Sequence, residues 1–212
     1  MAPTPKTPEA PSPPRWDADP GSALPNDVGA GLDELRLDGV ALAGGRHRAL
    51  MIRDCELRTC DLSTLSAREG RLLRTELTGC RATGLDWPEG ALRDVTFRDC
   101  QLDLASFRFS ALQRVVFEGC VLREADFAQT RCESLRFEAC DLSSASFERA
   151  TLRRTELRGC TLDALQGVEG LRGAAMEWAD VVALAPVFAS ALGIRILGDQ
   201  ALTSAAARGA GP

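Results

Sequence analysis

The chain is poor in the residues that usually carry catalysis or bind metals. It has 212 residues, a single histidine (His47), a single lysine (Lys6) and no cysteine pair in a CxxC arrangement. A structural zinc site needs four closely spaced Cys or His ligands, so none is expected. Cys–His or Ser–His catalysis lacks its histidine partner, and no GxxxxGK[ST] or strand–GxGxxG–helix phosphate-binding motif occurs. We therefore expect no enzyme activity, no metal and no cofactor.

Long apolar runs are also missing. No stretch of 18 or more apolar residues occurs, so we expect no membrane span. The first residues, MAPTPKTPEAPSPPRW, lack the apolar core of a signal peptide. The sequence therefore predicts a cytoplasmic protein whose eight cysteines stay reduced.

Charge is unevenly distributed along the chain. The formal net charge is −5, of which −4 falls in residues 1–35, 0 in residues 36–165 and −1 in residues 166–212. Residues 1–30 also hold eight of the eleven prolines. Such a composition buries too little apolar surface to offset chain ordering, so we predict a disordered leader over 1–30. Its PxxP-like spacing (Pro5–Pro8, Pro8–Pro11, Pro11–Pro14) leaves open a second interpretation, a ligand for a proline-binding domain.

A five-residue period dominates the middle of the chain. Counting every fifth residue from Leu37 to Leu162, 21 of 26 positions are Leu, Ile or Phe. The positions two residues earlier, Leu35 to Leu165, are all small or aliphatic, and these 53 positions hold no charge. Two inward sites flanking one outward site indicate a short extended segment. The next two residues turn a corner, and glycines at Gly39 and Gly44 suit such a turn.

The cysteines indicate how many corners close one coil. They recur every 20 residues at Cys60, Cys80, Cys100, Cys120, Cys140 and Cys160. If like residues stack on like, one coil is four pentads, and about 6.5 coils fit, spanning ~30 Å at ~4.8 Å per strand. The cysteine column is then an interior ladder of small side chains rather than a redox or metal site. His47 falls on an inward position and is predicted to be a core or edge histidine.

These pentads resemble the pentapeptide-repeat family, whose consensus is A(D/N)LXX. The matching segments are CDLST (Cys60–Thr64), CVLRE from Cys120, ADFAQ (Ala125–Gln129), CDLSS (Cys140–Ser144) and ASFER (Ala145–Arg149). The resemblance implies an all-β solenoid, a right-handed quadrilateral β-helix, over residues 31–167. Atypical pentads, with Gly45, Gly70 and Gly90 two before a centre and Pro88 after Trp87, predict looser coils near 43–50 and 66–91.

The segment 168–198 has a different pattern. Trp178, Val181, Val182, Ala185, Phe188, Ala189 and Leu192 recur at helical spacing. We predict an α-helix that caps the open end of the solenoid, kinked or split at Pro186. Ile194–Leu197 is predicted as a short strand and 199–212 as a flexible tail. In the family that this chain resembles, a similar element also mediates dimerisation, so a homodimer through the helix is the alternative.

Outward charges can be sorted by face, because every fourth pentad shares a face. The four faces carry −2, −3, 0 and +5, and the basic face contains only arginines. Arginine suits bidentate binding of carboxylate or phosphate, although a merely solvated face fits the same pattern. The candidate partner-binding residues are Arg53, Arg71, Arg74, Arg93, Arg114, Arg131, Arg153 and Arg154.

The function class follows from this regularity. We predict a non-catalytic scaffold or protein-interaction module, with an acidic protein preferred over nucleic acid because Phe109 is the one outward aromatic residue. The resemblance implies an alternative, a modulator or protector of DNA gyrase or a related topoisomerase that mimics duplex DNA. Coils that are net neutral weaken that alternative, since a duplex carries one negative charge per ~1.7 Å.

Overall fold

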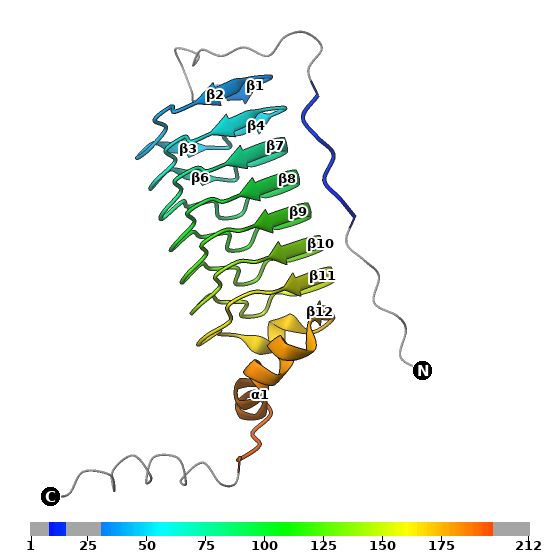
Figure 1. The fold of residues 1–212 in the computed structure, drawn as a ribbon. Helices are drawn as coiled ribbons and strands as arrows, with labels where there is room; N and C mark the ends of the chain where they lie inside the picture. The colour runs from blue at the N-terminus through cyan, green and yellow to red at the C-terminus, as the bar shows by residue number, and fades with distance from the viewer. Residues whose placement is uncertain (1–8, 16–30, 197–212) are drawn as a thin grey trace, which may run out of the picture.

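The computed structural model describes residues 9–15 and 31–196, which form a column of stacked coils followed by one helix (Figure 1). The longer strands are the repeating rungs of one parallel sheet: β7 (Arg71–Thr78), β8 (Ala91–Arg98), β9 (Ala111–Glu118), β10 (Arg131–Glu138) and β11 (Thr151–Arg158). Shorter strands build the first coils: β1 (Leu32–Asp33), β2 (Arg36–Asp38), β3 (Arg46–Arg48), β4 (Met51–Arg53), β5 (Glu56–Arg58) and β6 (Ser66–Arg68). The chain then forms the 3-10 helix η2 (Val168–Leu171), strand β12 (Ala174–Met176) and helix α1 (Trp178–Ala191).

The register between coils is 20 residues throughout. Leu72 pairs with Leu92, Leu92 with Leu112, and Leu112 with Cys132, all in parallel. The pairing order β1-β4-β7-β8-β9-β10-β11-β12 carries this register from one end of the stack to the other, over about seven turns. The predicted quadrilateral β-solenoid with a C-terminal helix is confirmed.

Every coil turns four corners, and each corner has the same backbone conformation. All 27 positions at five-residue steps from Glu34 to Ala164 have a positive φ, and 21 of them are not glycine. A left-handed conformation is costly for a residue with a Cβ, so the surrounding inter-coil hydrogen bonds must hold it in place. Asp94, for example, has φ 58° in the middle of β8, where it bends the rung between two faces.

The interior contains two columns of phenylalanine rings. Phe97, Phe117 and Phe137 stack with centroid separations of 4.8 and 5.1 Å. Phe107 and Phe127 stack beside them at 5.2 Å and meet the first column edge to face. Such offset and edge-to-face geometries are the favourable ones for aromatic pairs. These columns explain why the inward centres of the later coils are phenylalanine.

The cysteines form the predicted interior ladder. All eight are buried and unpaired. In the ladder, the Cys100 thiol donates to the carbonyl of Leu77 at 3.5 Å, and the Cys120 thiol repeats this contact with Phe97 at 3.5 Å. The side chain at this position therefore donates back to the preceding coil. Ser110 does the same through its hydroxyl, at 2.7 Å from the Trp87 carbonyl oxygen.

The coils near Trp87 keep the regular register, contrary to the looser packing expected there. Ser66 pairs with Asp86 and Asp86 with Ser106, each at a step of 20. The Trp87 ring is 1% exposed, and Cβ atoms added at Gly70 and Gly90 would lie 2.6 and 2.4 Å from it. These two glycines provide the space that the indole fills.

The end of the solenoid is covered by η2 and one side of α1. Val168, Leu171 and Leu184 are buried and belong to the main core. Helix α1 is continuous through Pro186, so the helix is not split. The strand predicted at Ile194–Leu197 does not form at Ile194–Ile196, and Leu197 lies outside the described residues.

Two predicted segments fall largely outside the described residues. These are the leader, of which only Glu9–Arg15 is described, and the tail at 199–212. Within the described part of the chain, no helix is long and apolar enough to cross a membrane.

A candidate interaction face

The candidate arginine face is formed by β4 and the first halves of β7 to β11. Its outward side chains come from positions 51–54 and their equivalents at 20-residue steps. The pleat alternates inward and outward side chains, which is why every coil presents its polar residues on this surface. The eight predicted arginines do lie here, but they divide into two groups by their partners.

The first group lies on the corner where the rungs bend. Arg74 donates through Nε to Oδ1 of Asp54 at 2.6 Å, one coil away. Arg114 donates to both oxygens of Asp94 at 2.6 and 2.7 Å. Such bidentate, charge-assisted pairs are the strong ones. Both carboxylates are buried, with Asp54 at 3% and Asp94 at 4% exposed, so the pairing satisfies charges that water does not reach.

The pKa values of these two carboxyl groups are set by opposing effects. Burial acts to raise the pKa of Asp94, but hydrogen bonds from Arg114 and from the backbone of Ser12 outweigh it. Burial also acts to raise the pKa of Asp54, and bonds from Arg74 and the backbone of Arg15 outweigh it. Both groups therefore have a pKa below the usual value and are ionised at neutral pH.

Two further arginines of the face are also paired. Arg53 donates to Asp33 at 2.7 Å, and Arg93 lies 3.6 Å from Asp94. Arg154 pairs with Glu133 and, at 2.9 Å, with Glu9. The net charge of +5 counted from the sequence thus overstates how many cations on this face are available to a partner.

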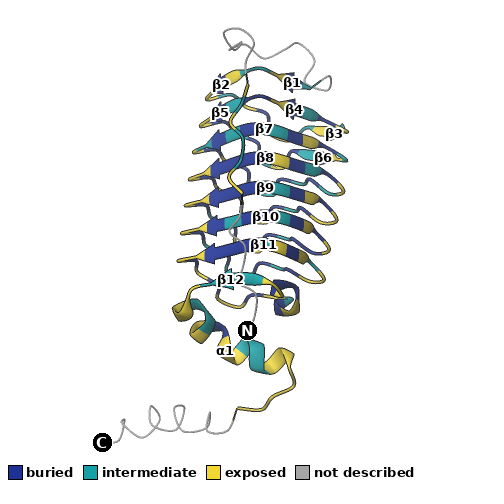
Figure 2. Ribbon diagram, turned by 90° about the vertical axis from the view of Figure 1, so that its right-hand side faces the viewer, coloured by how far each residue is buried: buried dark blue, intermediate teal, exposed yellow. Residues whose placement is uncertain are grey.

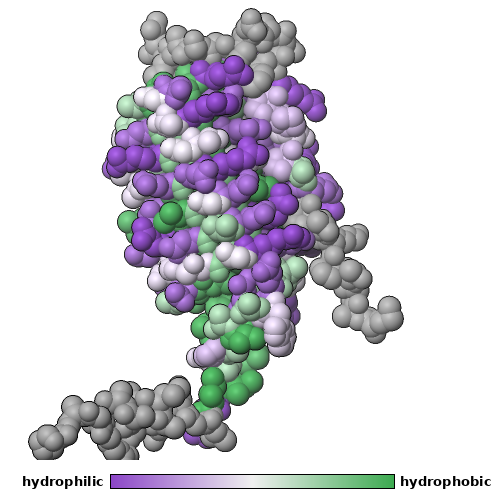
Figure 3. Space-filling model, viewed as in Figure 1, coloured by the Kyte–Doolittle hydropathy of each residue, from purple (hydrophilic) through white to green (hydrophobic). Residues whose placement is uncertain are grey.

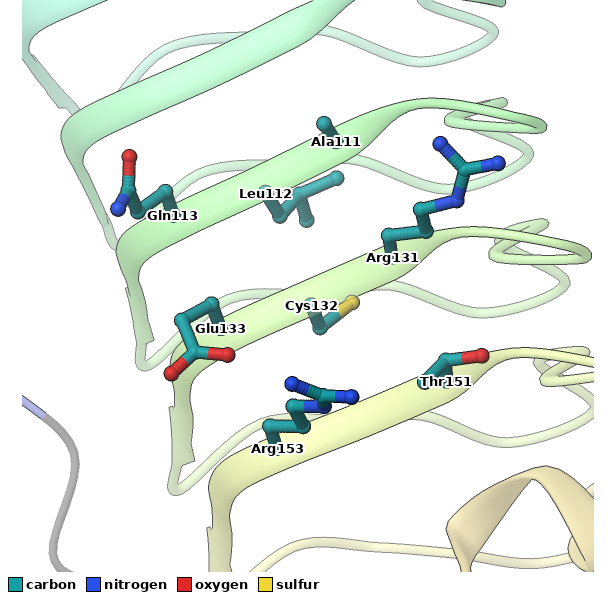
Figure 4. A pocket seen from close by; sticks show the side chains of 8 residues that line it. All are labelled: Ala111, Leu112, Gln113, Arg131, Cys132, Glu133, Thr151 and Arg153. Atoms are coloured by element: carbon teal, nitrogen blue, oxygen red, sulfur yellow. The ribbon is translucent and has the colours of Figure 1, made fainter.

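The second group consists of Arg71, Arg131 and Arg153. All three are exposed, and none has a carboxylate within 4.0 Å in residues 9–15 and 31–196. Arg131 and Arg153 border a shallow hollow of about 480 Å³, on the neighbouring rungs β10 and β11 (Figure 4). The short side chains of Ala111 and Thr151 leave this hollow open, so its two guanidinium groups suit a carboxylate or phosphate ligand.

Cys132 also lines the hollow, but it is a poor nucleophile. Its side chain is 3% exposed, and burial raises the pKa of its thiol to about 12. A thiol with such a pKa stays protonated at neutral pH, whereas the thiolate is the reactive form. Within the described residues, no group of three or more His, Cys, Asp or Glu side chains could hold a metal ion.

Sequence reasoning missed a contact made by the leader. Glu9–Arg15 runs along the solenoid and crosses the rungs near their corner (Figures 1 and 2). The Ser12 N–H donates to Asp94 at 2.9 Å, and the Arg15 N–H donates to Asp54 at 2.7 Å. The donors are main-chain groups, which carry no sequence signal. The acceptors could have been suspected as aspartates at alternate coils of one column.

Helix α1 presents an apolar patch at the end of the molecule (Figure 3). Five large apolar side chains are exposed, at 79%, 54%, 75%, 56% and 53%: Trp178, Val182, Leu192, Ile194 and Ile196. The predicted helical stripe was therefore only partly right. Leu184 is buried and Val181 and Phe188 are half-buried, whereas Trp178, Val182 and Leu192 face away from the solenoid.

Comparison with known proteins agrees with the observed repeats. The family model described as "Pentapeptide repeat region" matches residues 50–127 and 92–166, which together exceed half of the chain. No curated protein gives a significant match.

Solved structures give weak overall superpositions. QnrB1, a plasmid-mediated fluoroquinolone resistance protein, is 21% identical, with 81% of this chain and 93% of that chain covered and a TM-score of 0.33. Rfr23, a pentapeptide repeat protein from the cyanobacterium Cyanothece 51142, is 16% identical, with 49% and 60% covered and a TM-score of 0.28. HetL from the cyanobacterium Nostoc is 18% identical, with 69% and 89% covered and a TM-score of 0.21. On the strength of the family model and the five-residue repeat, the chain belongs to the pentapeptide-repeat family.

Proposed function

We propose that this protein is a non-catalytic interaction module that assembles as a homodimer through α1. The observation that carries this proposal is the exposed apolar patch of Trp178, Val182, Leu192, Ile194 and Ile196. Contiguous apolar surface on a soluble domain marks an interaction site when polar residues surround it. Burying one large apolar side chain contributes about 1.5–3 kcal/mol, so covering this patch favours association.

A groove next to the patch supports docking of a second copy. It measures about 550 Å³ and lies between the end of the solenoid and α1. Leu171, Met176, Val181, Phe188 and Leu192 line it. An exposed side chain from another α1, such as Trp178, is of the size and chemistry that such a groove accepts. In a symmetric dimer the two copies would exchange these contacts.

Analytical ultracentrifugation of the full chain tests the dimer. Wild-type protein is expected to sediment as a dimer at micromolar concentration, and Val182→Glu as a monomer. Ala183→Glu is the matched control, because Ala183 is exposed on the same helix but outside the patch. A monomeric wild type at 100 µM (about tenfold above the range of a stable dimer), or equal dissociation of both variants, would refute this assembly.

A second candidate site, for an acidic protein partner, is supported by Arg131 and Arg153. Their guanidinium groups are exposed around one hollow and have no carboxylate partner within the described residues. Arg131→Glu with Arg153→Glu should abolish binding to an acidic partner. Arg114 is unsuitable for this test, since reversing it would break the Asp94 pair at the corner. Binding that persists in the double variant, or that ignores salt, would exclude this site.

DNA mimicry with gyrase as target is less well supported. The two acidic faces carry only −2 and −3. Part of that charge is paired, as in Arg98 with Glu118 at 3.2 Å and Arg123 with Asp103 at 2.7 Å. A supercoiling assay with a fluoroquinolone decides this alternative, because a mimic would inhibit or rescue gyrase at micromolar protein.

A further inference from the structure

The leader segment Glu9–Arg15 has an extended backbone imposed by its own sequence. Three of its seven residues are proline, at Pro11, Pro13 and Pro14. Proline fixes φ near −65°, and a residue before proline is pushed to the extended region. Pro11 and Pro14 are half-buried whereas Pro13 is exposed, as expected for a three-residue polyproline period with one side against the solenoid.

The spacing of this segment matches the spacing of the solenoid. Ser12 and Arg15 donate to Asp94 and Asp54, which lie two coils apart. Two coils span ~9.6 Å at ~4.8 Å per strand. Three residues of polyproline II span ~9.3 Å at ~3.1 Å each. A donor at every third leader residue therefore meets an aspartate at every second coil.

The far end of the segment adds a charge contact. Glu9, three residues before Ser12, accepts a hydrogen bond from Arg154 at 2.9 Å and lies 4.0 Å from Arg114. The leader thus offers an acid, an N–H and an N–H at three-residue steps. The corner offers arginine, aspartate and aspartate in the matching order, so both polarity and direction are specified.

We propose that the corner formed by Asp54, Asp94, Arg114 and Arg154 is a binding site for an extended proline-rich segment with this three-residue spacing. Its resident ligand is the chain's own Glu9–Arg15. The PxxP-spaced residues of the leader thereby recognise this protein's solenoid, and no separate proline-binding domain is needed to explain them. Arg71, Arg131 and Arg153 remain exposed beside the bound segment.

Amide hydrogen exchange in the full-length chain tests the proposal. After correction for intrinsic rates, the Ser12 and Arg15 amides should exchange at least about tenfold more slowly than the Ala10 amide, as expected for a hydrogen bond to a carboxylate. Asp94→Asn should remove most of the protection at Ser12. Asp103→Asn is the matched control, because it breaks an inter-coil pair with Arg123 away from the leader. Unprotected amides, or equal loss in both variants, would overturn the proposal.

Binding in trans gives a second, independent measurement. Ser12→Pro deletes the N–H donor but keeps an extended backbone, so it loosens the resident segment, whereas Ser12→Ala keeps the donor. A fluorescein-labelled peptide of residues 7–16 should bind full-length Ser12→Pro at least about tenfold more tightly than Ser12→Ala, because the tethered leader competes at millimolar effective concentration. Asp94→Asn should not bind the peptide. Equal binding to all three chains, or binding to none, would refute sequence-specific recognition by this corner.

Discussion

Replacing Phe117 with leucine is expected to destabilise the coils that carry the arginine hollow. The Phe117 ring stacks on Phe97 at 4.8 Å and on Phe137 at 5.1 Å. It also meets Phe107 and Phe127 edge to face, each at 6.0 Å. Leucine occupies the same column at other coils, so the variant should keep the fold while losing all four ring contacts.

The magnitude follows from a comparison with Phe147. Both side chains are 0% exposed, so the loss of apolar burial on changing Phe to Leu is the same at both sites. Phe147 stacks on Phe127 at 5.1 Å and meets Phe137 edge to face at 6.0 Å. Phe117 therefore loses one further stacked pair and one further edge-to-face pair. At about 0.5–1.5 kcal/mol per pair, Phe117→Leu should cost about 1–3 kcal/mol more than Phe147→Leu.

Urea denaturation followed by far-UV circular dichroism measures this difference. The comparison holds if both variants and the wild type unfold with the same m-value, since a changed m-value would signal loss of two-state behaviour. A difference below about 0.5 kcal/mol, or a larger loss for Phe147→Leu, would refute the additive ring-stacking argument.

Three further changes test other parts of the structure. Cys100→Ser should change the free energy of unfolding by less than about 1 kcal/mol, because a hydroxyl can donate to the Leu77 carbonyl as the thiol does; a large loss in a denaturation curve would contradict the ladder role. Gly90→Ala should cost about 1–3 kcal/mol, since its Cβ would lie 2.4 Å from the Trp87 ring, and Trp87→Leu should offset part of that cost in a double-mutant cycle. The lowered pKa of Asp94 means that its pairing stabilises the fold above the usual carboxyl pKa and is lost as pH falls through the lowered value. The stability gap between wild type and Asp94→Asn should therefore narrow from pH 7 toward pH 3, and a constant gap would contradict this linkage.

The fold was predictable because its determinants repeat. The five-residue period specified the inward positions, and the recurrence of Cys60 and Cys80 specified the coil of 20. Irregular coils were harder to interpret, because the fit of Trp87 depends on Gly70 and Gly90 in two different coils. A glycine that looked like a weak repeat in isolation is the complement of a large neighbour. Only the three-dimensional stack brings the members of that group together.

The candidate site was only partly predictable, for a different reason. A charge count assigns Arg74 and Arg114 to a basic face, but pairing with aspartates 20 residues away neutralises them. Once the coil length was known, this pairing could have been inferred from the sequence. The orientation of α1 could not, because apolar residues surround much of the helix. Docking through Leu184 decided which side stays exposed.

The alternation of charge along the corner explains how an extended segment can be recognised there. If Asp54 and Asp94 were joined by a third aspartate at the intervening coil, like charges would lie ~4.8 Å apart and repel one another. Arg74 occupies that coil instead and pairs with Asp54. The alternation also sets the acceptor spacing at ~9.6 Å, which an extended chain meets with whole residues, whereas ~4.8 Å would require a donor every one and a half residues. The remaining mismatch of ~0.3 Å per step accumulates, so only a short segment can keep register with the corner. A leader contact of seven residues, ending where Glu9 reaches Arg154 through flexible side chains, is consistent with that limit.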